Sequence, residues 1–92
     1  MATIHMEVES MRSAVSTMRN ALAQMEQQVN ILGNTVSSVI GSAWIAPSAN
    51  EFHASFQEWA ASSKFLFEQL DMLSQRLNVE IAQFEQTGAK LN

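Results

Sequence analysis

The sequence predicts an all-α fold in which two long helices pack antiparallel as a hairpin. Apolar residues recur at alternating steps of three and four positions along both halves of the chain, which is the heptad pattern of packed helices. The only proline, Pro47, stands near the middle of 92 residues, which is enough chain for one domain at most. We expect a single domain over 1–92, with helix 1 at about 4–42, a turn at about 43–48, helix 2 at about 49–87 and a frayed tail at 88–92.

Helix 1 is predicted from an unbroken apolar seam. Its members are Ile4, Val8, Met11, Val15, Met18, Leu22, Met25, Val29, Leu32, Val36 and Val39. Thr3 is a candidate N-cap. Ala14 and Ala21 lie beside the seam and are small enough for another helix to approach closely. Gly33 costs about 1 kcal/mol relative to alanine in a helix, but the seam continues through it, so we expect one helix that ends near Gly41.

The turn is predicted from local signals around the proline. Ala46 precedes Pro47, which disfavours helical backbone angles at Ala46. Ser48 and Glu51 have the spacing of a capping box, and Pro47 and Phe52 occupy the positions of a hydrophobic staple. We therefore expect helix 2 to start at Ser48.

Helix 2 carries two apolar rows. The main seam consists of Phe52, Phe56, Trp59, Ser63, Leu66, Leu70, Leu73, Leu77, Ile81 and Phe84. A second row, Phe65, Met72 and Val79, repeats every seven residues away from it. A two-helix hairpin buries one stripe per helix and is a poor core alone, so the second row favours another neighbour, most simply a second hairpin that completes a four-helix bundle. The predicted partner interface is Phe65, Met72 and Val79, with Ala14 and Ala21.

Composition excludes several function classes. The net charge is −4 and the five basic residues form no run, which argues against nucleic acid and anionic lipid as partners. No apolar run approaches the roughly 20 residues of a membrane helix, and the N-terminal segment does not resemble a cleaved signal peptide. There is no cysteine, so disulfides and thiol chemistry are excluded.

No catalytic, cofactor or metal site is predicted. His5 and His53 would be separated by about 50–60 Å of helix in the hairpin, too far to share a site. No acidic pair is joined by a histidine at metal-ligand spacing, and the three glycines stand apart, so no phosphate-binding loop is present. We expect a protein that is not an enzyme and needs no cofactor.

Trp44 allows two interpretations. It could plug the end of the hairpin as a large apolar side chain. Alternatively, it could be a partly exposed aromatic residue that a partner recognises. Composition and periodicity alone favour the first.

The centre of the chain resembles a known family. Trp44 lies between two heptad helices, with Phe52 eight and Trp59 fifteen residues later. This arrangement, which covers nearly the whole chain, is similar to the WXG family of early-secreted-antigen-type (ESAT-like) proteins, the small substrates of bacterial type VII secretion. The motif here is Trp44, Ile45 and Ala46, followed by Pro47, with alanine where the family has glycine. The family's export signal, a tyrosine followed four residues later by an acid, is absent because the chain has no tyrosine.

The resemblance implies a hairpin that dimerises into a four-helix bundle and is exported folded by a secretion machine with an ATPase. It implies a location in the cytoplasm before export and outside the cell afterwards, and no enzymatic activity. A homodimer is the simplest assembly, and a heterodimer with a related small helical protein is the alternative. A non-secreted adaptor or chaperone that pairs with a toxin is the alternative function, and a lipid-binding hairpin is a third class that the acidic charge disfavours.

Overall fold

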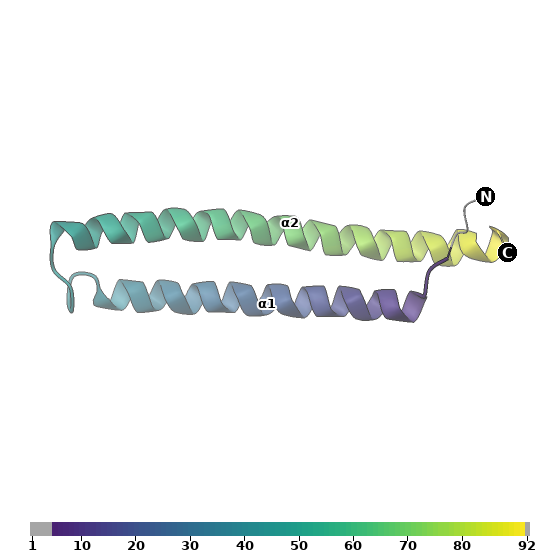
Figure 1. Cartoon of the computed structure of the whole chain (residues 1–92), viewed down its shortest axis with the longest axis horizontal. Coiled ribbons are helices and arrows are strands. Elements are labelled where there is room, and N and C mark those ends of the chain that lie inside the picture. The colour runs from purple at the N-terminus through teal and green to yellow at the C-terminus, as the bar shows by residue number, and fades with distance from the viewer. Residues whose placement is uncertain (1–4, 92) are drawn as a thin grey trace.

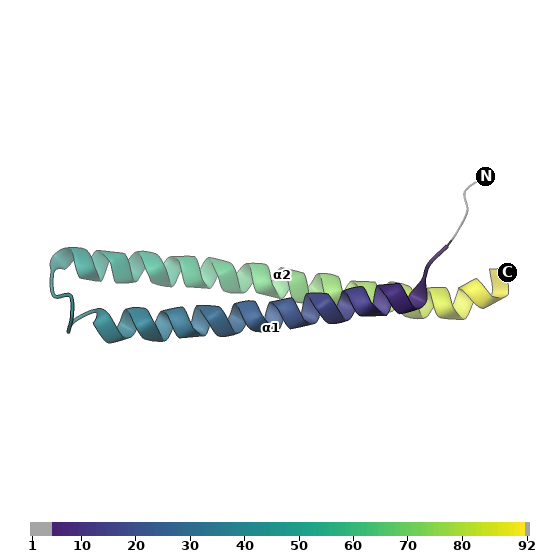
Figure 2. The same cartoon turned by 60° about the horizontal axis from the view of Figure 1, so that its bottom comes forward.

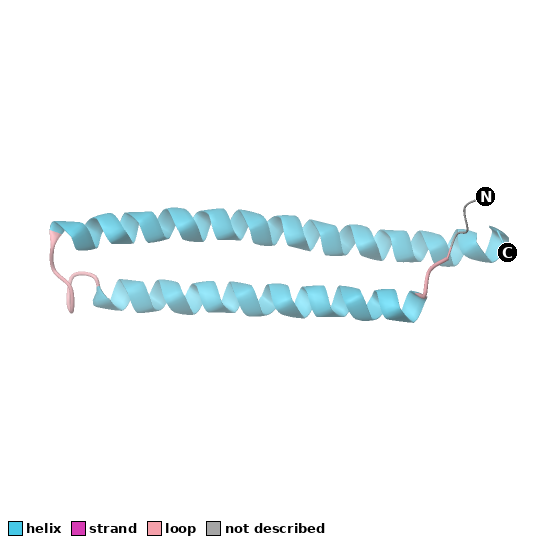
Figure 3. Cartoon of the chain, viewed as in Figure 1, coloured by secondary structure: helices cyan, strands magenta, loops and turns pink. Residues whose placement is uncertain are grey.

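Two long helices lie side by side and form the whole architecture of the part of the chain that the structure describes (Figure 1). The structure, a computed structural model, describes residues 5–91, and the side chains of residues 5–87. Helix α1 spans Val8–Val39 and helix α2 spans Pro47–Leu91. The two views in Figures 1 and 2 agree that the helices run antiparallel, with the turn at one end and the start of α1 near the end of α2 at the other, which we call the open end. The predicted all-α hairpin is confirmed, and Figure 3 shows loop only before α1 and in the turn.

Helix α1 is shorter than expected at both ends. The predicted cap at Thr3 lies outside the described residues. Within them, Glu7 is the N-cap, with extended backbone angles and no capping hydrogen bond from its side chain. At the other end Ile40 is extended, and Gly41 has a φ of +84°, in the left-handed region that favours glycine after a helix. The helix therefore stops at Val39 rather than at residue 42.

Helix α2 is longer than expected at both ends. It begins at Pro47, whose missing N–H and fixed φ suit the first position of a helix. The carbonyl of Ala46 accepts a hydrogen bond from the amide of Ala49 at 3.0 Å. Ser48 consequently lies inside the first turn, and the predicted N-cap at Ser48 is wrong. The helix also continues through Gly88 to Leu91 instead of fraying at 88.

One row of the predicted α1 seam, which includes Val29 and Val36, faces inward along the whole helix, whereas the other row is exposed from Met25 onward. Val15 and Leu22 are buried between the helices. Towards the turn, Leu32 is exposed, and Gly33 takes the inward position. A methyl group at Gly33 would lie 3.9 Å from the ring of Phe56. This change follows from helix geometry, because a straight helix with 3.6 residues per turn drifts away from a seven-residue repeat.

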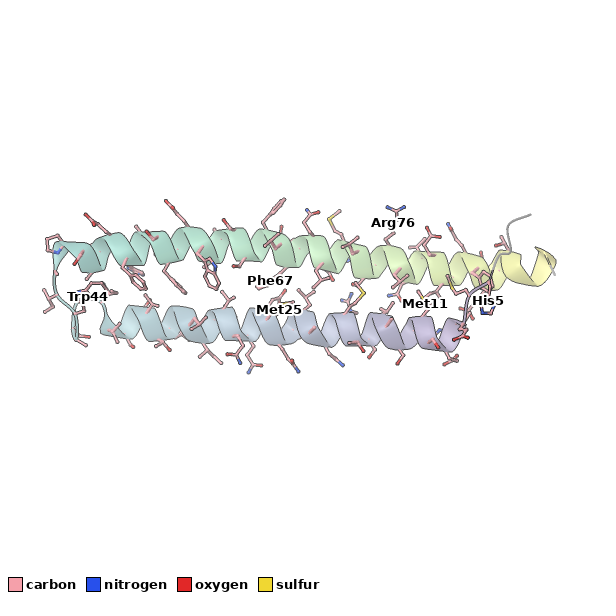
Figure 4. All side chains as sticks on the ribbon, viewed as in Figure 1. His5, Met11, Met25, Trp44, Phe67 and Arg76 are labelled. Carbon is pink, nitrogen blue, oxygen red and sulfur yellow. The ribbon has the colours of Figure 1, made fainter. Side chains whose placement is uncertain are left out.

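The inward face of α2 differs from the predicted main seam along part of its length. Part of the seam is right: Phe56, Ser63, Leu70, Leu77 and Phe84 are half-buried and Ile81 is buried. The other part is displaced by one residue: Phe52, Trp59, Leu66 and Leu73 are exposed, while His53, Ala60, Phe67 and Ser74 take the inward positions. Ala49, one heptad before Phe56, is buried as well. Figure 4 shows the Phe67 side chain on the side of α2 that faces α1. Small side chains at Ala49 and Ser74 allow close approach of the helices, and this leaves larger apolar residues outside.

The hairpin leaves an unusually large surface for its mass. Its accessible surface is 7045 Å², whereas a compact monomer of 10.2 kDa would expose about 5,300 Å². The radius of gyration is 20.7 Å, compared with about 12 Å for a compact domain of this length. The molecule measures 68 × 20 × 17 Å. Much of the apolar surface of each helix is therefore left without a partner inside the chain.

Candidate partner-binding site

The turn holds Trp44 through its backbone. The amide of Trp44 donates to the carbonyl of Val39 at 2.9 Å, and the carbonyl of Trp44 accepts from the amide of Gly41 at 3.0 Å. Both backbone polar groups of Trp44 are therefore used within the turn. The hydroxyl of Ser42 adds a hydrogen bond to the carbonyl of Ser38 at 2.7 Å. The backbone of Trp44 is thus fixed by the hydrogen bonds that end α1.

The indole of Trp44 packs on Phe52 and stays partly exposed. The ring centroids lie 5.8 Å apart, with the planes inclined by 50°. Trp44 is 39% exposed, and its neighbour Ile45 is 79% exposed. Figure 4 shows Trp44 at the turn, on the inner side of the hairpin end. The tryptophan closes the end of the hairpin on one side and offers apolar surface on the other.

Alanine at position 46 is compatible with the geometry of this turn. Among the described residues, no residue other than glycine has a positive φ. The conformation that requires glycine falls at Gly41, five residues before Ala46. The substitution of alanine for the family's glycine therefore imposes no left-handed strain here.

One long side of the hairpin is apolar. A groove there is lined by Met25 and Leu32 of α1 and by Trp59 of α2, among other residues. Each of the exposed heptad rows extends this surface along its own helix, and Phe52 joins it to Trp44. We call this surface the apolar face and define it as Met18, Met25, Leu32, Val39, Trp44, Phe52, Trp59, Leu66 and Leu73.

The opposite long side of the hairpin carries the ion pairs that join the helices. Arg19 lies 3.1 Å from Asp71, and Arg12 contacts Glu85 nearer the open end. A groove on this side is lined by Arg19 and Asp71, together with Glu26. We call this side the charged face. The hairpin therefore has one face suited to apolar contact and one suited to water.

A polar cluster fixes the register of the two helices. The guanidinium of Arg19 donates to the hydroxyl of Ser74 at 3.0 Å, and that hydroxyl donates to the carbonyl of Asp71 at 2.8 Å. Gln75 donates to the other carboxylate oxygen of Asp71 at 2.8 Å. Ser74 is only 1% exposed, so a shift along the helix would leave a buried hydroxyl without partners.

The structure places the predicted interface residues on two different surfaces. Ala14 and Ala21 are exposed, and Ala21 lines the groove of the apolar face. Phe65, Met72 and Val79 are 59%, 61% and 53% exposed. At about 100° per residue, their row starts on the far side of α2 from α1, although the side chain of Met72 also lines the groove of the charged face. We call Phe65, Met72 and Val79 the outer row, and it is separate from the two alanines.

A feature that sequence reasoning missed is the distribution of charge. No charged residue occurs from Gln27 to Asn50, which covers the last part of α1 and the whole turn. The charged residues near the turn are therefore Glu51 and Glu58 of α2, while the ion pairs that join the helices lie in the other half. A count of charges along the chain would have revealed this.

Groups that could support metal chemistry are not found in the part of the chain that the structure describes. There, no three His, Cys, Asp or Glu side chains are placed to hold a metal ion. His5 lies at the open end (Figure 4), whereas His53 is in the second turn of α2. No helix within these residues is both long and apolar enough to cross a membrane.

These features define a small helical-hairpin protein with a partly exposed tryptophan in its turn and an extended apolar face. The family described as "Proteins of 100 residues with WXG" (WXG100) matches residues 3–89, and the chain belongs to this family. WXG100 proteins are small, helical, non-enzymatic secreted proteins of type VII secretion systems, and they typically form dimers. No curated protein and no solved structure matched the chain.

Proposed function

We propose that the protein is a type VII secretion substrate that acts through protein–protein contacts, as a homodimer formed by the apolar face. The observation that carries the proposal is the row Phe52, Trp59, Leu66 and Leu73, which stays exposed although it is apolar and follows heptad spacing. A row of this kind fits the groove between helices of another hairpin. Two hairpins packed in this way make a four-helix bundle.

The large accessible surface of the hairpin supports the binding of a second chain. The hairpin exposes about 1,700 Å² more than a compact monomer of its mass. A standard protein interface buries about 800 Å² on each partner. An interface of this size on the apolar face would thus remove about half of the excess surface.

The test compares two neighbouring residues of similar exposure. Leu66→Lys places a charge on the apolar face, and Phe65→Lys places the same charge on the outer row. Leu66 is 63% exposed and Phe65 59% exposed in the hairpin, so neither change disturbs its core. In light scattering at tens of micromolar, the original chain and Phe65→Lys should be dimers, and Leu66→Lys a monomer. A monomeric original chain, or a dimeric Leu66→Lys variant, would overturn the proposal.

Export needs a test of its own. The family's tyrosine-and-acid signal has no counterpart in a chain without tyrosine, so we propose that a co-exported partner supplies it. Secretion should therefore require both an active type VII ATPase and a second small helical protein encoded nearby. Export of the chain alone from a strain with the ATPase would contradict the need for a partner, and export without the ATPase would contradict the route.

A second candidate function rests on the outer row. Phe65, Met72 and Val79 face away from α1 and stay free when the apolar face is covered. In this alternative the protein is an adaptor or chaperone that holds a helix of a toxin against the outer row. Phe65→Lys combined with Met72→Lys should abolish co-purification with such a partner while the homodimer persists. Loss of neither or of both would reject this alternative.

A further inference from the structure

We infer that the groove of the charged face binds a helix of a different protein, and that one arginine of this helix lies over Phe67, between the carboxylates of Glu26 and Glu68. The groove belongs to a single hairpin and lies on the side opposite the apolar face. It therefore stays open whether or not a second copy covers the apolar face, and the inference does not depend on the homodimer.

The groove consists of two cavities that meet in the middle of the charged face. Glu26, Phe67 and Glu68 line both cavities and so mark the point where they join. Figure 4 shows the Phe67 side chain on the side of α2 that faces α1. Apolar side chains from both helices form the rest of the groove, among them Leu22, Ala23, Val29, Ala60 and Ala61.

The length of the groove suits a short helix. Arg19 and Asn30 mark its two ends on α1, and they are separated by about eleven residues or roughly 16 Å, which is three turns of helix. Arg19 lies 3.1 Å from Asp71 and Gly33 faces Phe56, so residues at the same level on α1 and α2 have numbers that add up to about 90. Phe67 is therefore level with Ala23, whose side chain is too small to cover the ring.

The charges that line the groove indicate which helix fits. Arg19 and Asp71 pair with one another, whereas Glu26 and Glu68 take part in no ion pair within the described residues. With Lys64, the lining has two basic and three acidic side chains, which leaves a net charge of −1. One cation from the partner would neutralise the groove.

Arginine meets these requirements better than other side chains. Its planar guanidinium has enough N–H donors for two carboxylates, and it stacks on aromatic rings. Its apolar stem can lie along the apolar lining while the head stays near water. A helix with an acidic residue at this point would face Glu26 and Glu68 with like charge, and a wholly apolar helix would cover them without a partner.

The first test compares two peptides that differ only in charge. The probe is a capped helical peptide of about fourteen residues, built from alanine, leucine and glutamine with one central arginine. Its control carries citrulline, which has nearly the same shape and no charge. In fluorescence anisotropy with the whole chain, the arginine peptide should bind at least about fivefold more tightly. Equal Kd values for the two peptides would overturn the inference.

The second test locates the site with conservative variants of exposed residues. Glu26→Gln and Glu68→Gln should each weaken binding of the arginine peptide about threefold. Lys64→Gln removes a positive charge from the groove and should tighten binding. Glu58→Gln is the matched control, because Glu58 is an exposed acid of α2 that lines neither cavity, and it should leave Kd unchanged.

The variants also separate this inference from the homodimer. An unchanged Kd for Glu26→Gln and Glu68→Gln, or an equal loss for Glu58→Gln, would overturn the site. Weaker binding by Lys64→Gln would overturn it too. A chain that is monomeric by light scattering, yet binds the arginine peptide and responds to these variants as expected, would support the site while the proposed homodimer fails.

Discussion

The ring of Trp44 contacts the ring of Phe52 across the turn, with centroids 5.8 Å apart. Trp44 belongs to the turn and Phe52 to the second turn of α2, so this contact joins the hairpin end to the helix that leaves it. Phe52 is also the first residue of the exposed row on α2. The family tryptophan is therefore held by the same residue that begins the apolar face.

Removing Phe52 should loosen Trp44. Phe52→Ala deletes the aromatic contact, which is worth about 0.5–1.5 kcal/mol beyond the buried area. In a background where Trp59→Phe leaves Trp44 as the only tryptophan, fluorescence emission should shift to longer wavelength as the indole gains water. Ser55→Ala is a control on an exposed position of the same helix. Unchanged emission from Phe52→Ala would mean that the backbone alone positions the ring.

Glycine should matter at position 41 and not at position 46. Gly41→Ala forces a side chain into φ +84°, which costs about 1–2 kcal/mol, so thermal unfolding should occur at lower temperature. Ala46→Gly restores the residue of the family motif, yet it should give no gain, because φ at Ala46 is not positive. It should instead lose up to about 1 kcal/mol through greater freedom of the unfolded chain. Stabilisation by Ala46→Gly would contradict this account of the turn.

Gly33→Ala should stabilise the hairpin. Alanine is favoured over glycine inside a helix by about 1 kcal/mol. The added methyl would lie 3.9 Å from the ring of Phe56, an ordinary contact that requires no shift. Urea unfolding followed by circular dichroism measures the gain. A decrease in stability would show that α1 uses the flexibility of this glycine.

The ion pair between Arg19 and Asp71 should contribute modestly. Both side chains are more than one third exposed, and pairs of this kind contribute about 0.2–1 kcal/mol. Asp71→Ala also removes the acceptor of Gln75, so we expect a loss near the upper end of this range, and a smaller loss at high salt. Glu68→Ala, at a neighbouring exposed residue in no ion pair among the described residues, is the control and should change stability by no more than about 0.5 kcal/mol. Equal losses of stability for both variants would mean that Asp71 does not help to fix the register of the two helices.

The fold was predictable from the sequence because its signals are local. The heptad spacing and Pro47 are enough to define two helices and one turn. The rotation of α2 was not predictable from spacing, since the row that includes Trp59 and the row that includes Ala60 satisfy the same repeat one residue apart. Choosing the larger residue for the core gave the wrong row. The choice depends on how closely α1 approaches, which is a property of both helices together.

The site was predictable only in part for a similar reason. Trp44 was singled out because it stands alone between two helical patterns, and it lies in the turn between α1 and α2. Whether the outer row and Ala21 share a surface depends on the rotation of α2 about its own axis, and the rotation expected from the heptad pattern was wrong by one residue. With the observed rotation, the outer row and the apolar face are two different surfaces.

The segment from Gln27 to Asn50, which contains no charge, divides the molecule's response to ionic strength. The ion pairs of Arg12 and Arg19 lie towards the open end and weaken as added salt screens them. Apolar packing, which salts such as sulfate strengthen, holds both halves, since Val15, Leu22 and Ile81 are buried towards the open end. Hydrogen exchange at increasing sulfate concentration should therefore become slower along the whole hairpin, and most of all near the turn, where the described residues form no ion pair between the helices. One hairpin would then respond to salt unequally along its length.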